Sequence, residues 1–262
     1  MSKNSFKWDA KLYQKSSSFQ FDMGLMAIER LNPQDGENIL EIGSGNAMVT
    51  IELAKKNPNG KITAIEISKE MCAQAYENLE NSRLSNVEII CKDGIEIDFN
   101  NKFDAAFSNS AIHWIHNLEL MYELIYKSLR PNGRILIQTG LKDISPIVLI
   151  LAKLIRLKPF REYISNLMMP WRFLSVKENQ RILERCEFQD IIIEPLDYVM
   201  KFEDKESVLN YWKAAGLVPF LSVLPDELHN DFIEKFKDIY FEKMSETPLE
   251  YIMARLFISA NK

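Results

Sequence analysis

The sequence predicts an α/β fold with a doubly wound, mostly parallel sheet, and three observations indicate it. From Glu37 onward, short apolar runs alternate with stretches of helical periodicity. The first run leads into a small-residue turn, Gly43-Ser44-Gly45, that is followed by a helical pattern. Carboxylates close or follow the next two runs, at Glu66 and Asp93. This alternation is typical of a sheet built from βα units.

Seven segments carry strand signals, and helical patterns separate most of them. The expected strands are Asn38–Ile42, Lys61–Glu66, Val87–Cys91, Phe103–Ser108, Arg134–Thr139, Phe188–Glu194 and Ile252–Ala260. The expected helices are Ala47–Lys56, Lys69–Ser82, Leu118–Leu129 and Val176–Cys186, with a helical block over Lys205–Ser245. Arg130-Pro131-Asn132-Gly133 is expected to be a turn before the fifth strand.

A single domain is expected to contain all of these elements. Its core covers about residues 22–141, 176–203 and 246–262 and follows an N-terminal segment, 1–21. The strand rhythm breaks over about 142–175, and this stretch is predicted to join 204–245 in a helical cap that forms a lid over the site. The apolar residues of the cap could line a pocket for a hydrophobic substrate, or they could belong to ordinary core packing between the cap and the sheet.

Composition excludes several classes of protein. Of 262 residues, 47% are hydrophobic and 26% are charged, which is ordinary for a folded domain. The net charge of −5 argues against nucleic acid as a partner. Three cysteines, with no CxxC spacing and no neighbouring histidine cluster, predict reduced thiols and no metal site.

The sequence also predicts a cytoplasmic protein without stable membrane insertion. The first residues are polar and charged where a signal peptide would need an apolar run. The most apolar segment, Pro146–Leu157, is too short to span a bilayer and contains Lys153 and Arg156. A buried or interfacial helix is therefore expected there.

The turn after the first strand is a candidate ligand loop. Glycines at 43 and 45 let backbone amides approach a ligand closely. Met48 stands where a dinucleotide fingerprint requires a third glycine, which disfavours nicotinamide chemistry. Taken alone, the turn could also be a tight connection without a ligand.

The next two carboxylates fit an adenosine-containing cofactor. Glu66 lies 23 positions beyond Gly43, a spacing that lets a carboxylate accept from both hydroxyls of a ribose. Asp93, in Lys92-Asp93-Gly94, could accept from an adenine amino group. The alternatives are a solvated strand end for Glu66 and a plain turn residue for Asp93.

Taken in order, the motifs resemble class I S-adenosylmethionine-dependent methyltransferases. The resemblance rests on Glu41–Gly45, Glu66, Lys92–Gly94 and Phe103–Asn109 and covers about residues 37–139. It implies a Rossmann-like sheet of seven strands with an antiparallel last strand. Ala111-Ile112-His113-Trp114-Ile115 is similar to the branch that contains trans-aconitate and juvenile hormone acid methyltransferases. Tyr13–Gln20 is similar to an N-terminal segment of the juvenile hormone acid enzymes, and Tyr211–Leu221 is similar to a C-terminal segment of the trans-aconitate enzymes.

The same resemblance implies S-adenosyl-L-methionine as cofactor and assigns residues to its parts. Gly43, Ser44 and Gly45 would line the methionine part, with Glu41 near its amino group through water. Glu66 would lie at the ribose, Asp93 and Gly94 at adenine, and Ser108 or Asn109 at the methionyl end, and Ile67 would also belong to the cofactor-binding residues. Asn46-Ala47 departs from the commoner glycine at the end of the first motif.

The predicted acceptor is a small or medium-sized molecule, and a carboxylic acid with a hydrophobic part is one candidate. By resemblance, Gln20 and Trp114 would lie near its carboxylate, although Trp114 could equally be pocket wall. His113 or His116 could act as a base for a carbon, hydroxyl or amine acceptor, or be a loop histidine without that role. The alternatives are therefore a C- or N-methyltransferase and a non-catalytic cofactor-binding module, and the oligomeric state stays open.

Overall fold

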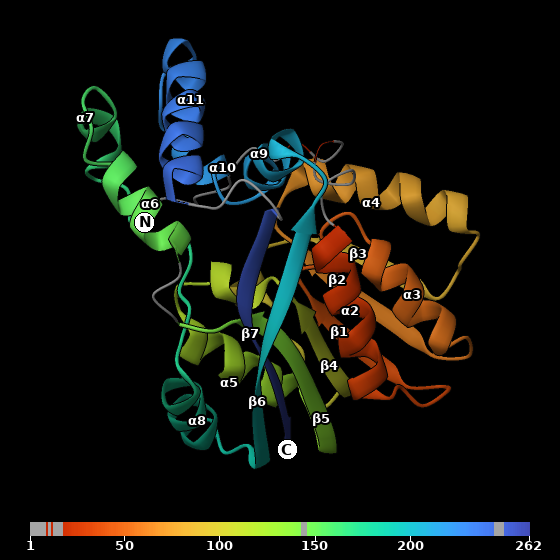
Figure 1. Cartoon of the computed structure of the whole chain (residues 1–262). Coiled ribbons are helices and arrows are strands. Elements are labelled where there is room, and N and C mark those ends of the chain that lie inside the picture. Colours follow the sequence, from red (N-terminus) through yellow and green to blue (C-terminus); the bar gives the residue numbers. More distant parts are fainter. Residues whose placement is uncertain (1–8, 10–11, 13–17, 143–145, 244–248) are drawn as a thin grey trace. The chain divides into compact units, whose positions relative to one another are not determined.

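A computed structural model of the chain describes residues 18–142, 146–243 and 249–262, together with Asp9 and Leu12 (Figure 1). Its strands are β1 Asn38–Ile42, β2 Lys61–Glu66, β3 Val87–Cys91, β4 Phe103–Asn109, β5 Leu129–Gly140, β6 Gln189–Phe202 and β7 Leu249–Asn261. Its α-helices are α2 Ser18–Leu31, α3 Met48–Lys56, α4 Lys69–Ser82, α5 Leu118–Ser128, α6 Pro146–Leu154, α7 Phe160–Ile164, α8 Val176–Arg185, α9 Lys205–Ala214, α10 Val218–Leu221 and α11 Asp226–Lys243. Two short 3-10 helices are η1 Gly94–Glu96 and η2 Ile112–Trp114. The predicted segment Tyr13–Ser17 lies outside the described residues.

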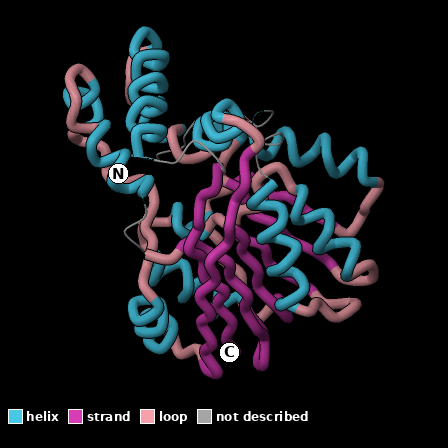
Figure 2. Tube along the Cα trace, viewed as in Figure 1, coloured by secondary structure: helices cyan, strands magenta, loops and turns pink. Residues whose placement is uncertain are grey.

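The seven strands form one sheet in the order β3-β2-β1-β4-β5-β7-β6 (Figure 2). The pairs from β3 to β5 are parallel, whereas β7 runs antiparallel to β5. The doubly wound sheet and the antiparallel last strand predicted from the sequence are confirmed. The chain changes direction across the sheet between β1 and β4, and such a switch point opens a crevice at the carboxyl ends of the strands.

Helices cover both faces of this sheet because the central strands are apolar on both sides. Alternate residues such as Leu40, Ala106 and Ile137 join a core cluster with α5 and α8. Residues of the opposite parity face the other side, where α2 and α3 contact each other. Polar side chains are therefore unusual on these buried strands, and Glu41 is one of them.

Several boundaries differ from the predictions. The expected turn Arg130–Gly133 is part of β5. It interrupts the pairing of β5 with β4, whose register shifts between the pairs Phe103–Leu129 and Ala105–Arg134. The sixth strand continues to Phe202 despite Pro195, which an edge strand tolerates because one side of its backbone needs no partner. Helix α2 was not anticipated from the sequence, although its buried residues recur at helical spacing.

The chain divides into two compact units. One contains residues 18–142, 171–196 and 254–262, and the other contains 1–17, 143–170 and 197–253. Within the second unit, Phe160 packs edge-on against Phe232 at 5.0 Å between ring centroids, and Lys153 pairs with Glu242 at 3.1 Å. The two predicted cap segments thus contact each other, while their role as a lid stays a prediction. Among the described residues, no helix is long and apolar enough to cross a membrane.

Candidate active site

The turn between β1 and α3 has a backbone that few residues can adopt. Gly43, Gly45 and Ala47 have φ values of 80°, 55° and 63°. A Cβ on Gly43 would lie 2.1 Å from the Cβ of Ala111, so the turn packs directly on the loop after β4. A Cβ on Gly45 would meet nothing within 4 Å, which leaves an open cradle beside that residue.

Glu66, at the end of β2, fixes the shape of this turn. One carboxylate oxygen accepts from the backbone N–H of Gly45 at 2.9 Å, and the other accepts from the N–H of Ser68 at 2.8 Å. Burial raises the pKa of the Glu66 carboxyl, while these backbone donors oppose the rise. Because a carboxylate oxygen can accept more than one hydrogen bond, Glu66 can hold the turn and still accept from a ligand.

Glu41 is the buried carboxyl beneath the turn. Its exposed fraction is 1%. Burial above all, together with the nearby charge of Glu66, raises its pKa to about 7, while the Thr50 hydroxyl opposes the rise. A buried carboxylate is stabilised by a cation, so this position suits a positively charged ligand group.

The loop after β3 contains a polar residue, Asp93, and an exposed apolar residue, Ile95. Asp93 is half-buried and caps η1 by accepting from the N–H of Ile95 at 3.2 Å. Gly94 is buried, and a Cβ there would lie 3.3 Å from the Met121 sulfur. Ile67 and Ile95 remain 43% and 37% exposed, which is unusual for isoleucine beside a glycine turn. Ile95 was not singled out from the sequence, because only its exposure distinguishes it.

Ser108 and Asn109, at the end of β4, have different surroundings. Ser108 is fully buried, and its hydroxyl donates to the Ile42 carbonyl at 2.8 Å. Asn109 is half-buried and donates to the backbone carbonyl of Gln20 at 2.8 Å. Of the two predicted candidates for the methionyl end, Asn109 therefore has the more accessible side chain, and contact of either with the cofactor stays a prediction.

Buried polar atoms without partners gather in these segments. Each lacks a hydrogen bond to any described residue: Gln20 Oε1, Glu41 Oε2, Ser44 Oγ, Asn46 Nδ2 and Asn109 Oδ1. Buried polar groups in proteins are nearly always satisfied, so a group of orphans indicates a site that a polar ligand completes. Both donors and acceptors are present, which fits the amino, carboxylate and hydroxyl groups of a nucleoside-linked amino acid.

Aromatic side chains cluster in the loop after β4. His113 is buried, with its ring 4.8 Å from Phe173 and 5.6 Å from Trp114, and Trp114 meets Trp171 edge-on at 5.7 Å. Gly140 leaves room for Phe173, since a Cβ there would lie 2.4 Å from the ring. Sequence reasoning assigned Trp171 and Phe173 only to the apolar insert and missed their contact with the predicted catalytic residues.

The two loop histidines differ in environment. Burial, and then the charge of Arg255, lower the pKa of His113 well below its usual 6.5. Its Nδ1 lies 3.1 Å from the Thr139 hydroxyl. His116 is exposed, and its backbone carbonyl accepts from Arg172 at 3.0 Å. His113 is therefore a neutral, buried ring at neutral pH.

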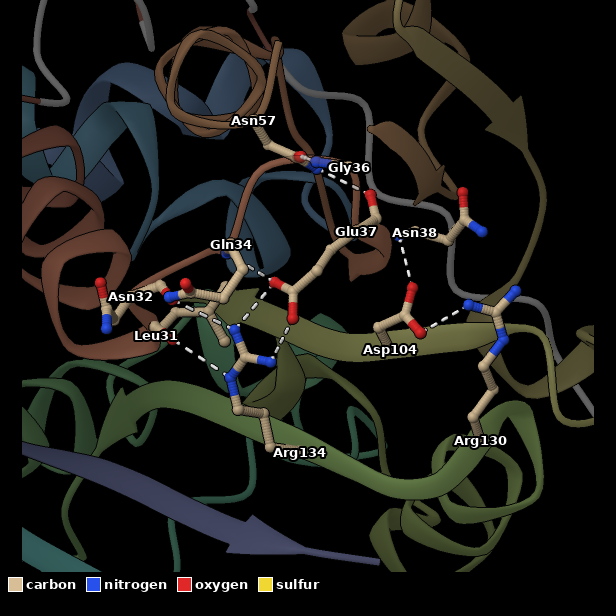
Figure 3. A network of polar contacts seen from close by, with 10 residues as sticks. All are labelled: Leu31, Asn32, Gln34, Gly36, Glu37, Asn38, Asn57, Asp104, Arg130 and Arg134. Carbon is tan, nitrogen blue, oxygen red and sulfur yellow. Dashed lines mark hydrogen bonds and ion pairs between the residues drawn. The ribbon is translucent and has the colours of Figure 1, made fainter. Parts of the chain in front are cut away.

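A hollow of about 470 Å³ lies at the opposite, amino-terminal edge of the strands, where Figure 3 shows a network of paired groups. Arg134 donates to both carboxylate oxygens of Glu37 at 2.6 and 2.9 Å. Arg130 pairs with Asp104 at 2.5 Å, and Asp104 also accepts from the N–H of Asn38. These charges satisfy one another and join β1, β4 and β5, so the hollow is structural.

Metal-ligand chemistry has no candidate cluster in the described part of the chain, where no group of three or more His, Cys, Asp or Glu side chains could hold an ion. A glycine turn with carboxylates at the ends of neighbouring parallel strands instead defines the class of enzymes that bind a nucleoside cofactor at a switch point. The comparisons with known proteins identify which of them this is.

The chain belongs to the methyltransferase domain family, whose model matches residues 33–210. A malonyl-[acyl-carrier protein] O-methyltransferase from Priestia megaterium is 31% identical over 140 residues, which are 52% of this chain and 50% of that relative. The match therefore spans about half the length of that relative. The juvenile hormone acid O-methyltransferase of Drosophila melanogaster is 26% identical over 245 residues, covering 88% of this chain and 82% of the relative.

Among solved structures, phosphoethanolamine N-methyltransferase 2 from Haemonchus contortus, in complex with S-adenosyl-L-methionine, has a TM-score of 0.64. It is 20% identical, and the match covers 97% of this chain and 56% of that one. The chain is thus an S-adenosylmethionine-dependent methyltransferase with a Rossmann-like fold, which confirms the family, fold and cofactor predicted from the sequence.

Proposed function

We propose that this methyltransferase transfers the methyl group to the carboxylate oxygen of a small or medium-sized acid that has a hydrophobic part. The observation that carries this choice is the environment of His113, where burial holds the pKa of the ring well below its ordinary 6.5 and makes it a weak general base. A carboxylate is ionised at neutral pH and needs no general base, whereas hydroxyl, carbon and protonated amine acceptors must lose a proton. Two relatives named as O-methyltransferases, one of them acting on juvenile hormone acid, support the choice.

The geometry of the turn supports the assignment of the cofactor-binding residues. Gly43, Ser44 and Gly45 would hold the methionine part, and the orphaned Ser44 hydroxyl offers a donor and an acceptor there. Glu41 would lie near the amino group through water, and Glu66 would accept from the ribose hydroxyls. Burial raises the pKa of both carboxyls, and a cationic ligand would favour their ionised form.

At the adenine end, Asp93 and Gly94 would bind the edge of the ring. The exposed Ile67 and Ile95 would cover its faces, which would explain why two isoleucines are left in contact with solvent. Asn109, more than the buried Ser108, would lie at the methionyl end next to Gln20.

For a carboxylate acceptor, the main task of the protein would be to align the acceptor oxygen with the methyl group. When bound, S-adenosylmethionine would supply an activated methyl group on its sulfonium sulfur, and the residues of this chain would hold the acceptor oxygen in line with it. Trp114 and Gln20 would position the carboxylate, because an indole N–H and an amide N–H are donors. The rings of Trp171 and Phe173 would exclude water and contact the hydrophobic part, and such orientation lowers the barrier by several kcal/mol.

Calorimetric titration with S-adenosylmethionine and S-adenosylhomocysteine tests the cofactor site first. Glu66→Ala removes two acceptor oxygens and is expected to weaken binding at least about tenfold, since hydrogen bonds to charged groups contribute about 1.5–3 kcal/mol. Glu88→Ala is the matched control, because Glu88 is an exposed strand carboxylate paired only with Lys61. Equal affinities for the two variants would refute the assignment of Glu66.

Acceptor class is tested by offering carboxylic acids, alcohols and amines of the same carbon skeleton and detecting methylated products by mass spectrometry. Methyl esters as the only products would support the proposal. The alternative, C- or N-methylation, requires a base, and His113→Asn with His116→Asn separates the two. Transfer to carboxylates is expected to survive both changes, whereas loss of all activity from a folded double variant would favour a histidine base.

A further inference from the structure

Two cysteine side chains lie next to each other beside Glu66. Cys91 is the last residue of β3 and pairs in register with Glu66, the last residue of β2. Cys72 lies in the first turn of α4, and its thiol donates to the backbone carbonyl of Glu66 at 3.6 Å. The N–H of Lys92, which follows Cys91, donates to the same carbonyl at 2.8 Å. A single backbone oxygen thus contacts the Cys72 thiol and the residue next to Cys91.

The strand register directs both thiols to the same face of the sheet. Ile65 and Ile90, one position earlier on each strand, pack into the core cluster that includes α5. Side chains alternate along a strand, so Cys91 faces the opposite side, where α4 contacts both β2 and β3. Burial, and then a hydrogen bond with the Cys91 thiol, raise the pKa of the Cys72 thiol. The two sulfur atoms are therefore direct neighbours between α4 and the sheet.

The two thiols differ in their access to solvent. Cys91 is exposed, whereas Cys72 is 3% exposed. Oxidants in solution therefore reach Cys91 first, and the raised pKa of Cys72 keeps its proton in place until a neighbouring sulfur is activated. Cys186, the third cysteine, is also buried, and its thiol contacts the backbone carbonyl of Glu119 at 3.8 Å. It is a natural control for oxidation away from Glu66.

A chain of hydrogen bonds connects Cys72 to the cofactor turn. Ser68 caps α4 by accepting from the N–H of Met71, the neighbour of Cys72, at 3.2 Å. The N–H of Ser68 donates to one carboxylate oxygen of Glu66, and the other oxygen accepts from the N–H of Gly45. A disulfide holds its sulfur atoms at about 2.05 Å, much closer than unbonded sulfur atoms approach. Bonding Cys72 to Cys91 would therefore pull the start of α4, and with it Ser68, away from the position that holds the Glu66 carboxylate.

We propose that Cys72 and Cys91 are a reversible oxidation site, and that a disulfide between them weakens the binding of S-adenosylmethionine. The inference rests on the proposed function, because it assumes that Glu66 accepts from the ribose of the cofactor. Both cysteines are free thiols in the structure, which is the state that binds the cofactor. The oxidant is a hydroperoxide, such as hydrogen peroxide.

The oxidation takes place in two steps. The Cys91 sulfur attacks one peroxide oxygen, the O–O bond breaks, and the second oxygen leaves as water with the thiol proton, so that Cys91 becomes a sulfenic acid. The Cys72 sulfur then attacks the Cys91 sulfur, the S–O bond breaks, and the hydroxyl leaves as a second water with the Cys72 proton. The two sulfurs lose two electrons in total, and the peroxide gains them. A thiol reductant reverses the change by disulfide exchange.

The first test compares wild type with Cys91→Ala, Cys72→Ala and the control Cys186→Ala, each melted in its reduced form to confirm that it folds. Every protein is treated with hydrogen peroxide, and catalase then removes the excess. Mass spectrometry of unreduced peptides locates any disulfide. Calorimetry measures the affinity for S-adenosylhomocysteine before oxidation, after oxidation and after reduction with dithiothreitol.

Oxidised wild type and Cys186→Ala are expected to contain the disulfide, to bind about tenfold more weakly and to recover on reduction. Cys91→Ala should keep its affinity within about twofold after oxidation. Cys72→Ala can form only the sulfenic acid at Cys91, so its unchanged affinity would assign the effect to the disulfide. A folded wild type that forms no such disulfide, or an oxidised wild type with unchanged affinity, would overturn the inference.

The second test uses the reciprocity of coupled equilibria. A disulfide that lowers affinity tenfold must itself be disfavoured tenfold by the bound ligand, so saturating S-adenosylhomocysteine should raise the reduction potential of the pair by about 30 mV in glutathione buffers. A potential that the ligand does not change would refute the coupling.

The two tests distinguish this inference from the assignment of Glu66. Weaker binding after oxidation, in a protein whose Glu66→Ala variant binds normally, would support the oxidation site and refute Glu66 as its target. Weaker binding in Glu66→Ala alone would refute the oxidation site and leave the proposed cofactor contact intact.

Discussion

Both edges of the sheet carry polar side chains, but those of one edge are paired with each other and those of the other edge include groups without a partner among the described residues. At the amino-terminal edge, Glu37 pairs with Arg134 and Asp104 pairs with Arg130 (Figure 3). At the carboxyl-terminal edge, Ser44 Oγ and the second oxygen of Glu41 have no partner among the described residues. A completed network stabilises the fold, whereas an incomplete one at a switch point is completed by a ligand. Variants at the two edges should therefore separate stability from binding.

The largest effect is expected from a pair of glycine substitutions at the carboxyl edge. Gly43→Ala combines a positive φ with a clash against Ala111 and should lower the free energy of unfolding by about 3 kcal/mol or more. Gly45→Ala meets no atom and should cost only about 1 kcal/mol, yet its methyl group would fill the cradle and weaken S-adenosylmethionine binding at least about tenfold. Thermal unfolding and calorimetry measure the two effects. Unchanged cofactor affinity in Gly45→Ala would contradict the cradle.

Glu41 should make the free energy of unfolding depend on pH. Its folded pKa of about 7 lies above the ordinary 4.5, so the folded state holds a proton that the unfolded state releases between these values. Stability from this group is complete below pH 4.5 and is lost as pH rises through 7. The loss approaches about 3 kcal/mol, at about 1.4 kcal/mol per pH unit. Urea unfolding from pH 5 to 8 should show a loss of this size for wild type relative to Glu41→Gln, and parallel curves would contradict it.

The same carboxyl should release a proton when a cationic cofactor binds. Calorimetry at pH 7 in two buffers of different ionisation enthalpy detects the release, which Glu41→Gln should abolish. A buffer-independent enthalpy in wild type would show that the cofactor does not affect Glu41.

A smaller effect, confined to stability, is expected at the amino edge. Glu37→Gln leaves the partly buried Arg134 without its carboxylate and should cost about 1–3 kcal/mol. Cofactor affinity should stay within about twofold of wild type. Glu52→Gln, in the more exposed pair with Lys55, is the control and should change stability by less than about 1 kcal/mol. A loss of cofactor affinity in Glu37→Gln would contradict the conclusion that the amino-terminal edge contributes to stability and not to cofactor binding.

Local signals predicted most of the fold. The first three strands and the helix Lys69–Ser82 have the predicted bounds, because apolar runs and the Ser68 cap can be recognised over short windows. The strand Gln189–Phe202 was predicted too short, since Pro195 reads as a breaker until its place at the sheet edge is known.

The residues proposed to bind the cofactor could be predicted from the sequence, whereas the contact between Arg255 and Ser110 could not. Gly43, Gly45 and Glu66 follow from short motifs with fixed spacing. Arg255 lies 145 positions from Ser110, and only the antiparallel register of β5 and β7 brings them together.

Pro195 has a consequence for how the protein behaves in concentrated solution. It lies in β6, the outermost strand beyond β7, where an open edge could recruit a strand from another molecule. Proline has no N–H to offer such a strand, so a ladder of intermolecular hydrogen bonds would be interrupted at that residue. The residue that hides the length of this strand in the sequence thus protects the sheet from edge-to-edge aggregation.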